Sequence, residues 1–333
     1  MSFTRWVALA ACLALGACAS PQNFQQPIGD FATATASAST ALQTLDQTAT
    51  ANYNAVELAA ALKDPSKIGS KSGDCRLTSI DCTVVVNADQ PGGAALPLHV
   101  KSLVPNSVQV MTVVADYANG LKTLAAADST PAVQDGLGKT LGAAVSIATT
   151  VNAPTGTLIG AIQQPLTDTG VYLFQQYQNA ATVAALRRAT TAADPVIKDA
   201  MGLLSDEYIA VQNAAIARAS DDYELKLIAA RAPGGGEAAI DALVTSANTF
   251  DDELRLKNTN IYAQVATAHT TLKDALQNPD VSLTDAISQI QVLVQQIKNV
   301  QAIVADIQAA TQPPAPANQT PPPGPPPPPP ANQ

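Results

Sequence analysis

The sequence predicts an all-α protein, a bundle of about six to eight long antiparallel helices. Alanine is abundant in the 333-residue chain, whereas aromatic residues make up 4% and charged residues 14%, a composition that suits closely packed helices better than a β-sandwich. Apolar residues recur at spacings of three and four, which places them on one face of a helix. Proline and glycine separate these periodic segments, so we expect neighbouring helices to run antiparallel.

The amino-terminal residues carry a secretion signal. Arg5 supplies a positive charge, an apolar run follows from Trp6 to Leu15, and small residues come next at positions 16 and 17. This order is typical of a signal peptide, and the run is too short for a membrane span, which needs about 20 residues. We expect residues 1–17 to be removed and residues 18–29, which are polar and contain two prolines, to form a tether.

The motif Leu15-Gly16-Ala17-Cys18 resembles the lipobox of bacterial lipoproteins, in which an aliphatic residue and two small residues precede a cysteine. The resemblance implies cleavage before Cys18, lipid on the Cys18 thiol and attachment to a membrane of the bacterial envelope. Ala19 and Ser20 stand where inner-membrane lipoproteins of enterobacteria carry an aspartate, so the resemblance favours the outer membrane. The alternative is an ordinary signal peptide whose cleavage site happens to precede a cysteine.

Most of the expected helices end at a recognisable break. The first begins near Asp30 and ends at Lys63-Asp64-Pro65, because proline disfavours helical geometry in the residue before it. Asp194-Pro195 is typical of a helix start, with aspartate as the cap and proline in the first turn. Pro233-Gly234-Gly235-Gly236 and Asn278-Pro279 mark two further breaks. The predicted helical ranges are 30–62, 106–127, 129–152, 155–193, 194–232, 237–278 and 283–311, in a helical domain that spans residues 30–311.

Residues 66–105 depart from the helical pattern. They contain the β-branched run Thr83-Val84-Val85-Val86 and the turn signal Pro91-Gly92-Gly93, which predict a small hairpin or ordered loop inserted in the bundle. Cys75 and Cys82 lie in the same segment. An isolated cysteine pair in an exported chain indicates a disulfide, and a redox motif would need two intervening residues rather than six. We expect Cys75 and Cys82 to close a structural disulfide loop.

The chain ends in a proline-rich segment, residues 312–333. Proline has no amide hydrogen to donate to a helix or a sheet, so we expect an extended polyproline tail. It could serve as a spacer, bind a partner that recognises proline, or make no specific contact.

Charge and motif content exclude several functional classes. The formal net charge of −9 and the lack of a basic patch argue against nucleic acid as a partner. His99 and His269 have no motif around them, so the sequence predicts no catalytic set, no metal site and no cofactor. The carboxylate clusters Asp221-Asp222 and Asp251-Asp252-Glu253 lack the spacing of a calcium loop and are expected on solvated helix faces.

Residues 140–167 contain no charged side chain. One interpretation is a pair of helices buried at the centre of the bundle and packed through glycine and alanine. The other is a hairpin around Pro154 that inserts into a membrane. We favour the buried core, because threonine, asparagine and glutamine dilute the apolar character of the segment.

The leading hypothesis is a lipid-anchored envelope protein that acts as a non-enzymatic helical scaffold or binding module. Its contacts would be the membrane, through lipid on Cys18, and an envelope protein or a cell-wall component. The alternative is a membrane-active protein, similar to pore-forming proteins, that inserts residues 140–167. A hydrolase with an unrecognised site is the third hypothesis, because side chains distant in sequence can meet in the fold.

Overall fold

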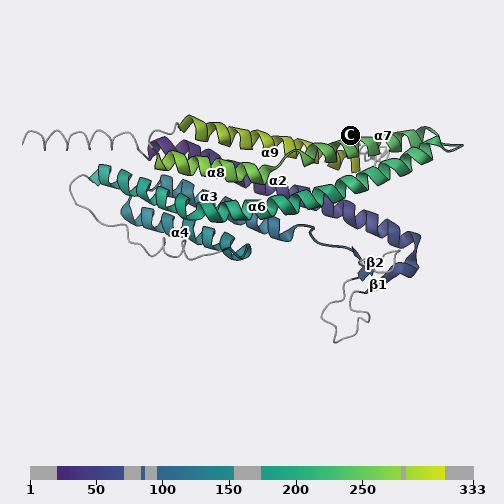
Figure 1. Ribbon diagram of the computed structural model, residues 1–333, viewed down its shortest axis with the longest axis horizontal. Coiled ribbons are helices and arrows are strands. Elements are labelled where there is room, and N and C mark those ends of the chain that lie inside the picture. Colours follow the sequence, from purple (N-terminus) through teal and green to yellow (C-terminus); the bar gives the residue numbers. More distant parts are fainter. Residues whose placement is uncertain (1–20, 71–83, 87–95, 154–173, 279–282, 312–333) are drawn as a thin grey trace, which may run out of the picture.

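Long helices lying lengthwise side by side make up nearly all of the structure, a computed structural model that describes residues 21–70, 84–86, 96–153, 174–278 and 283–311 (Figure 1). The all-α helical bundle predicted from composition and periodicity is therefore confirmed. The helices are α2 (Gln22–Lys63), α3 (Pro105–Ala125), α4 (Thr130–Thr150), α6 (Phe174–Arg231), α7 (Glu237–Lys257), α8 (Ile261–Gln277) and α9 (Leu283–Thr311).

Helix α2 begins at Gln22, so the tether predicted over residues 18–29 is wrong from that residue onward. Phe24 is 5% exposed, and Ile28 and Phe31 are fully buried, so the apolar stripe of this helix starts inside the predicted tether. Burying one such side chain contributes about 1.5–3 kcal/mol. Three of them together outweigh the cost of Pro27 inside the helix, which is about 3 kcal/mol.

Helix α6 is continuous through Pro195, so the helix start predicted at Asp194-Pro195 is wrong. Buried side chains precede and follow the proline on the same helix, among them Leu186 and Ile197, which are both fully buried. Packing on both sides of Pro195 keeps the chain helical, although proline has no amide hydrogen to donate to the helix. Asp194 caps nothing here, and its carboxylate bonds to residues of α8 instead.

The single helix predicted over residues 237–278 is also wrong, because α7 and α8 are separate helices. Asn260 caps α8, with its side-chain oxygen accepting from the Ala263 amide at 3.1 Å. Its amide nitrogen donates to Ser205 of α6 at 2.6 Å. Asparagine favours such capping positions because its short side chain competes for nearby backbone groups.

The insertion forms a three-stranded antiparallel sheet in the order β1-β2-β3, which confirms the predicted hairpin. Its strands are β1 (Ile68–Ser70), β2 (Val84–Val86) and β3 (Leu96–Pro97). Helix α2 holds the segment after β3: the Asn54 side chain makes two hydrogen bonds of 2.9 Å with the backbone of Val100. Cys75 and Cys82 lie outside the described residues, so their disulfide stays a prediction.

Small residues let the helices approach closely, as the alanine-rich composition predicts. A Cβ atom at Gly120 of α3 would lie 2.7 Å from the Thr140 Oγ1 and 3.0 Å from its Cα in α4. In α4, the first part of the uncharged segment packs into the core through Leu141, Ala144 and Ile147, all fully buried. Residues 154–167 of that segment lie outside the described residues. Within the described residues, no helix combines the length and apolarity needed to span a membrane.

The core does not extend along the whole molecule. Helices α6 and α7 continue past α3, α4, α8 and α9 as an antiparallel pair, and their turn forms one end of the molecule, while the last part of α2 diverges from them toward the sheet (Figure 1). Just before this pair of helices leaves the body, the Arg218 guanidinium lies 4.7 Å from the centre of the Tyr53 ring of α2. We call residues 219–245 the hairpin tip; none of its side chains is buried. The packed helices before it are the bundle body.

Candidate functional site

Three features of the described residues could carry a function: a buried polar cluster, a small cavity and the surface of the hairpin tip. The polar cluster centres on Asp194 of α6, which faces α8. Its Oδ2 accepts from Lys273 at 2.9 Å and from Lys198 at 3.0 Å, and its Oδ1 accepts from Thr270 at 3.0 Å. His269 Nδ1 lies 3.3 Å from the same Oδ1.

A chain of hydrogen bonds runs from Asp194 through His269 to Tyr117 of α3. The Tyr117 hydroxyl lies 2.9 Å from His269 Nε2. Burial lowers the pKa of His269, although Asp194 opposes this, and the neutral ring then donates from Nδ1 and accepts at Nε2. Burial also raises the pKa of Tyr117 well above its usual value, so its hydroxyl keeps its proton and donates.

Two lysines of the protein supply counter-charges for the Asp194 carboxylate. Burial opposes ionisation of Asp194, but hydrogen bonds from His269, Lys273, Lys198 and Thr270 hold its pKa far below the usual range. The order tyrosine–histidine–aspartate resembles that of a catalytic triad. Tyr117 and His269 are both fully buried, however, so no substrate can reach the tyrosine oxygen in this conformation. The arrangement joins three helices, and we assign it a structural role.

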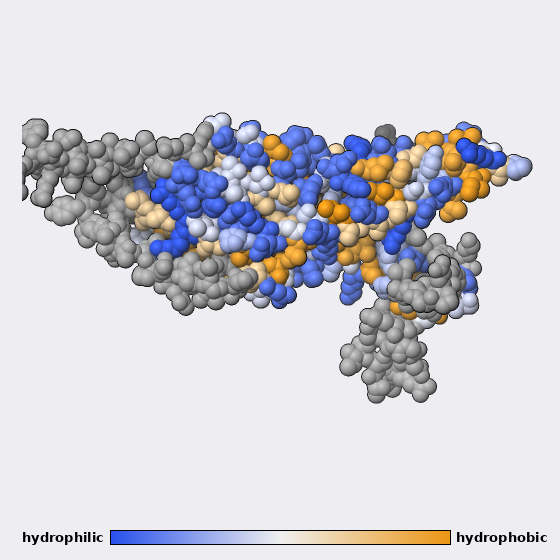
Figure 2. All heavy atoms as spheres, viewed as in Figure 1, coloured by the Kyte–Doolittle hydropathy of each residue, from blue (hydrophilic) through white to orange (hydrophobic). Residues whose placement is uncertain are grey.

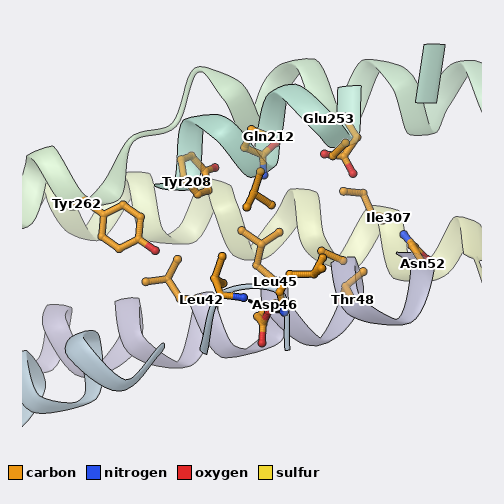
Figure 3. Close-up of a pocket in the computed structure, with 15 residues that line it drawn as sticks. Leu42, Leu45, Asp46, Thr48, Asn52, Tyr208, Gln212, Glu253, Tyr262 and Ile307 are labelled. Carbon is orange, nitrogen blue, oxygen red and sulfur yellow. Dashed lines mark hydrogen bonds between the residues drawn. The ribbon is translucent and has the colours of Figure 1, made fainter. Parts of the chain in front are cut away.

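The small cavity, about 40 Å³ in volume, lies where α7 meets the bundle body (Figure 3). Its walls come from α2, α6, α7, α8 and α9 and from Leu103 and Val104. Most of the lining is apolar; its polar members are Asp46, Thr48, Asn52, Tyr208, Gln212, Glu253 and Tyr262. A cavity of this size holds only a few water molecules, since each needs roughly 10–15 Å³.

Glu253 is the unusual group of this cavity. Burial, and then the neighbouring Asp252, raise the pKa of Glu253 to about 7. Asp252 is itself 7% exposed and pairs with Arg255 at 2.7 Å. The prediction that the cluster 251–253 lies on a solvated face is therefore wrong for Asp252. It holds for Asp251, and Glu253 is half-buried; Asp221 and Asp222 are exposed as predicted.

The hairpin tip presents large apolar side chains to solvent. Figure 2 shows them gathered at the α6–α7 end of the molecule. They are Leu225 (66% exposed), Ile228 (67%), Ile240 (53%) and Val244 (53%). Two contacts hold the helices of this region together: Ser246 donates to Asp222 at 2.5 Å, and the rings of Tyr223 and Phe250 stack at 6.5 Å. The tip is thus a formed helical pair without a core of its own.

The structure does not describe the residues predicted from motifs. Cys18, Cys75 and Cys82 all lie outside the described residues, and the predicted lipidation and disulfide stay predictions. Within the described part of the chain, no cluster of histidine, cysteine and carboxylate side chains could hold a metal ion. Comparisons with family models, curated proteins and solved structures find nothing that matches this chain.

Sequence reasoning missed Glu253, Gln212 and the Asp194–His269 pair. Each depends on contacts between helices far apart in the chain, for example α6 with α8 over 75 residues. The sequence did contain one signal for the hairpin tip. Leu225 and Ile228 follow three acidic residues on a helix segment whose other residues are typical of a solvent-facing surface. Apolar side chains on such a segment point to an exposed apolar surface.

Proposed function

We propose that this protein is a lipid-anchored, non-enzymatic binding module of the bacterial envelope, which docks a protein partner on its hairpin tip. Lipid on Cys18 would hold the amino terminus in a membrane. The body would act as a rigid spacer, and the tip would make the contact. The observation that carries this proposal is the exposure of four large apolar side chains on a helical pair that projects beyond the core.

Exposed apolar surface of this kind marks interaction sites, because leaving it in water is unfavourable and a partner can bury it. Leu225 and Ile228 are three residues apart on α6, and Ile240 and Val244 are four apart on α7. Each pair therefore shares one face of its helix. A partner that packs against the tip can thus bury several anchors at once, which is how interfaces concentrate their binding energy.

The charges of the tip indicate the chemistry of the partner. Acidic residues outnumber basic ones there; they are Asp221, Asp222, Glu224, Glu237 and Asp241, against Lys226 and Arg231. A second copy of this chain would bring like charges together, and an anionic lipid surface would repel the tip. We therefore expect a protein partner that presents apolar side chains flanked by lysine or arginine.

The position of the tip fits display away from the anchor. Helix α2 begins at the end of the body opposite the α6–α7 turn (Figure 1). Helix α6 alone, with 58 residues, is about 87 Å long at 1.5 Å per residue. A membrane attached before α2 would thus lie far from the tip.

Site-specific photo-crosslinking in the native envelope tests the docking surface. A crosslinker at position 225 or 240 should give the same discrete product, whereas position 203 should not. Leu203 is the matched control, because it is 53% exposed on the same helix but within the body. The purified partner should then bind the wild-type chain at least tenfold more tightly than Ile228→Asp, and binding should weaken with added salt.

Equal crosslinking at all three positions, or binding to vesicles of neutral lipid in place of a protein, would overturn this docking surface. The anchor is tested separately. Cys18→Ser should abolish labelling with a radioactive fatty acid and release the protein into the soluble fraction. Membrane retention without lipid labelling would contradict the anchor but leave the tip proposal standing.

A further inference from the structure

The cavity at the root of the hairpin lies between α7 and the body and is lined by two unusual side chains. Gln212 of α6 and Glu253 of α7 lie on the same side of the cavity (Figure 3). Gln212 is 3% exposed, and both its Oε1 and the Glu253 Oε2 are buried. Neither oxygen has a hydrogen-bond partner among the described residues.

Several hydrogen-bond donors near the cavity are engaged elsewhere. The Tyr208 hydroxyl donates to the carbonyl of Leu256 at 3.0 Å. Asp46 accepts from the backbone amides of Leu103 at 2.9 Å and Val104 at 3.1 Å, so these donors are also used. An ionised Glu253 has only acceptors, and so does the Gln212 carbonyl. Two buried acceptors, Gln212 Oε1 and Glu253 Oε2, thus share one cavity and neither accepts a hydrogen bond from the described residues, which is unfavourable.

One proton on Glu253 would give this pair of oxygens a donor. A protonated carboxyl carries an O–H group that can donate to the Gln212 carbonyl, directly or through a cavity water. We propose that Glu253 is a proton-operated latch, which holds α7 on the body when protonated and loosens this joint when ionised. The inference goes beyond the docking function, because it concerns the isolated chain and needs no partner.

The surroundings of Glu253 favour this behaviour. Among the described residues that line the cavity, none is basic. The titratable groups facing it are Asp46 from α2, Tyr208 from α6 and Tyr262 from α8, while α9 contributes Ile307. The nearest cation on α7, Arg255, is engaged by Asp252 at 2.7 Å and by Asp306 of α9 at 3.8 Å. An ionised Glu253 therefore has acidic neighbours and no counter-ion in the cavity.

The sign of the pH response follows from the pKa of Glu253, which burial raises from 4.5 to about 7. The folded joint holds the proton more tightly than the open state. Its extra stability is therefore fully present below pH 4.5 and is lost as the pH rises through 7. Linkage with these two values predicts a roughly tenfold increase in the opening equilibrium of the joint between pH 6 and pH 8.

Hydrogen exchange of α7 amides in the full chain tests the latch, after correction for the intrinsic pH dependence of exchange. The wild-type protein should lose about tenfold protection in α7 between pH 6 and pH 8. Glu253→Gln keeps a donor without the charge, so it should stay protected at both values. Glu253→Leu lacks both donor and charge, and its protection should be independent of pH but lower than that of Glu253→Gln.

Glu237→Gln is the control, since this glutamate lies exposed in the first turn of the same helix, and it should behave like the wild type. Equal pH dependence in Glu253→Gln and the wild type would overturn the latch. If a variant fails to fold, the carboxyl ¹³C shift of Glu253 in the wild-type chain decides. A titration midpoint near 7 supports the latch, and a midpoint near 4.5 contradicts it.

Discussion

Helix α6 passes through two different environments. In its first half, from Ala185 to Leu204, the inward residues are fully or almost fully buried against α3, α4 and α8. Beyond Arg218 the same helix has α7 as its neighbour, and no side chain of the tip is buried. Leu186 is 0% exposed, whereas Leu225, on the same helix, is 66% exposed.

The two regions have similar sequences, because both are rich in alanine and carry leucine and isoleucine at helical spacing. What differs is the number of helices around them. A body helix buries its stripe among several neighbours, while a helix of the tip can bury only the strip that faces its single partner. Exposed apolar residues on the tip therefore contribute little to the buried core, which is consistent with the docking role proposed for them.

The largest effect in the body is expected from Asp194→Ala. The change leaves His269 and Thr270 without their acceptor and removes the counter-charge of Lys273. Breaking a buried ion pair costs about 3–5 kcal/mol, so the free energy of unfolding should fall by roughly 4 kcal/mol in urea titrations. A loss below about 1 kcal/mol would show that the cluster does not hold α6 to α8.

The pH dependence of this loss has a definite sign. Hydrogen bonds hold the pKa of Asp194 far below its usual value of 3.8 in the folded protein. Its stabilisation is therefore present above pH 3.8 and lost as the pH falls below that value. Wild-type and Asp194→Ala proteins should accordingly converge in stability in acid.

A matched pair of leucine substitutions compares the regions directly. Leu186→Ala removes a fully buried side chain and should cost about 3 kcal/mol, within the range for buried leucines. Leu225→Ala, on the exposed tip, should change the free energy of unfolding by less than about 0.5 kcal/mol. Similar losses at both sites would mean that the tip is covered in the isolated protein.

A third test concerns close packing in the body. Gly120→Ala places a Cβ atom 2.7 Å from Thr140 Oγ1, so α3 and α4 must move apart. Overpacking costs about 1–3 kcal/mol, from which the better helix propensity of alanine recovers up to about 1 kcal/mol. We expect a net loss of about 1–2 kcal/mol in thermal unfolding. Gly138→Ala is the control, because its Cβ meets nothing within 4 Å and should be neutral or slightly stabilising.

Sequence reasoning reached the fold class because periodicity and breaks are local properties. In α9, for example, Ile290, Ile297, Val300, Val304 and Ile307 follow the helical spacing of a single face, and all five are buried. Sequence reasoning failed at Asp194-Pro195, where packing against other helices overrides a strong local signal for a helix start. It also failed at Asn258–Asn260, since asparagine side chains can end a helix or lie on its surface.

The burial of polar groups could not be predicted from the sequence, because it also depends on packing between helices. Glu253 stands in an acidic run that is typical of a solvated face, and it is half-buried because helices distant in sequence line the same cavity. The residues next to a charged side chain in a helix thus do not indicate whether that side chain is buried. The exposure of the apolar residues of the tip could not be predicted either, since their spacing matches that of a core stripe.

The smallest effect on the body is expected from cutting the tip. Arg231 is exposed at the end of α6, next to the turn formed by Pro233, Gly234 and Gly235. Few buried contacts hold this turn, so it should open locally at low free energy and be cut first by trypsin. Arg187 is the internal control, because its Nε donates to the Leu276 carbonyl at 2.5 Å within the body. The two fragments should remain associated through α8 and α9, with the melting temperature lowered by only a few degrees. Early cleavage at Arg187, or separation of the fragments, would show that the tip and the body form one cooperative unit.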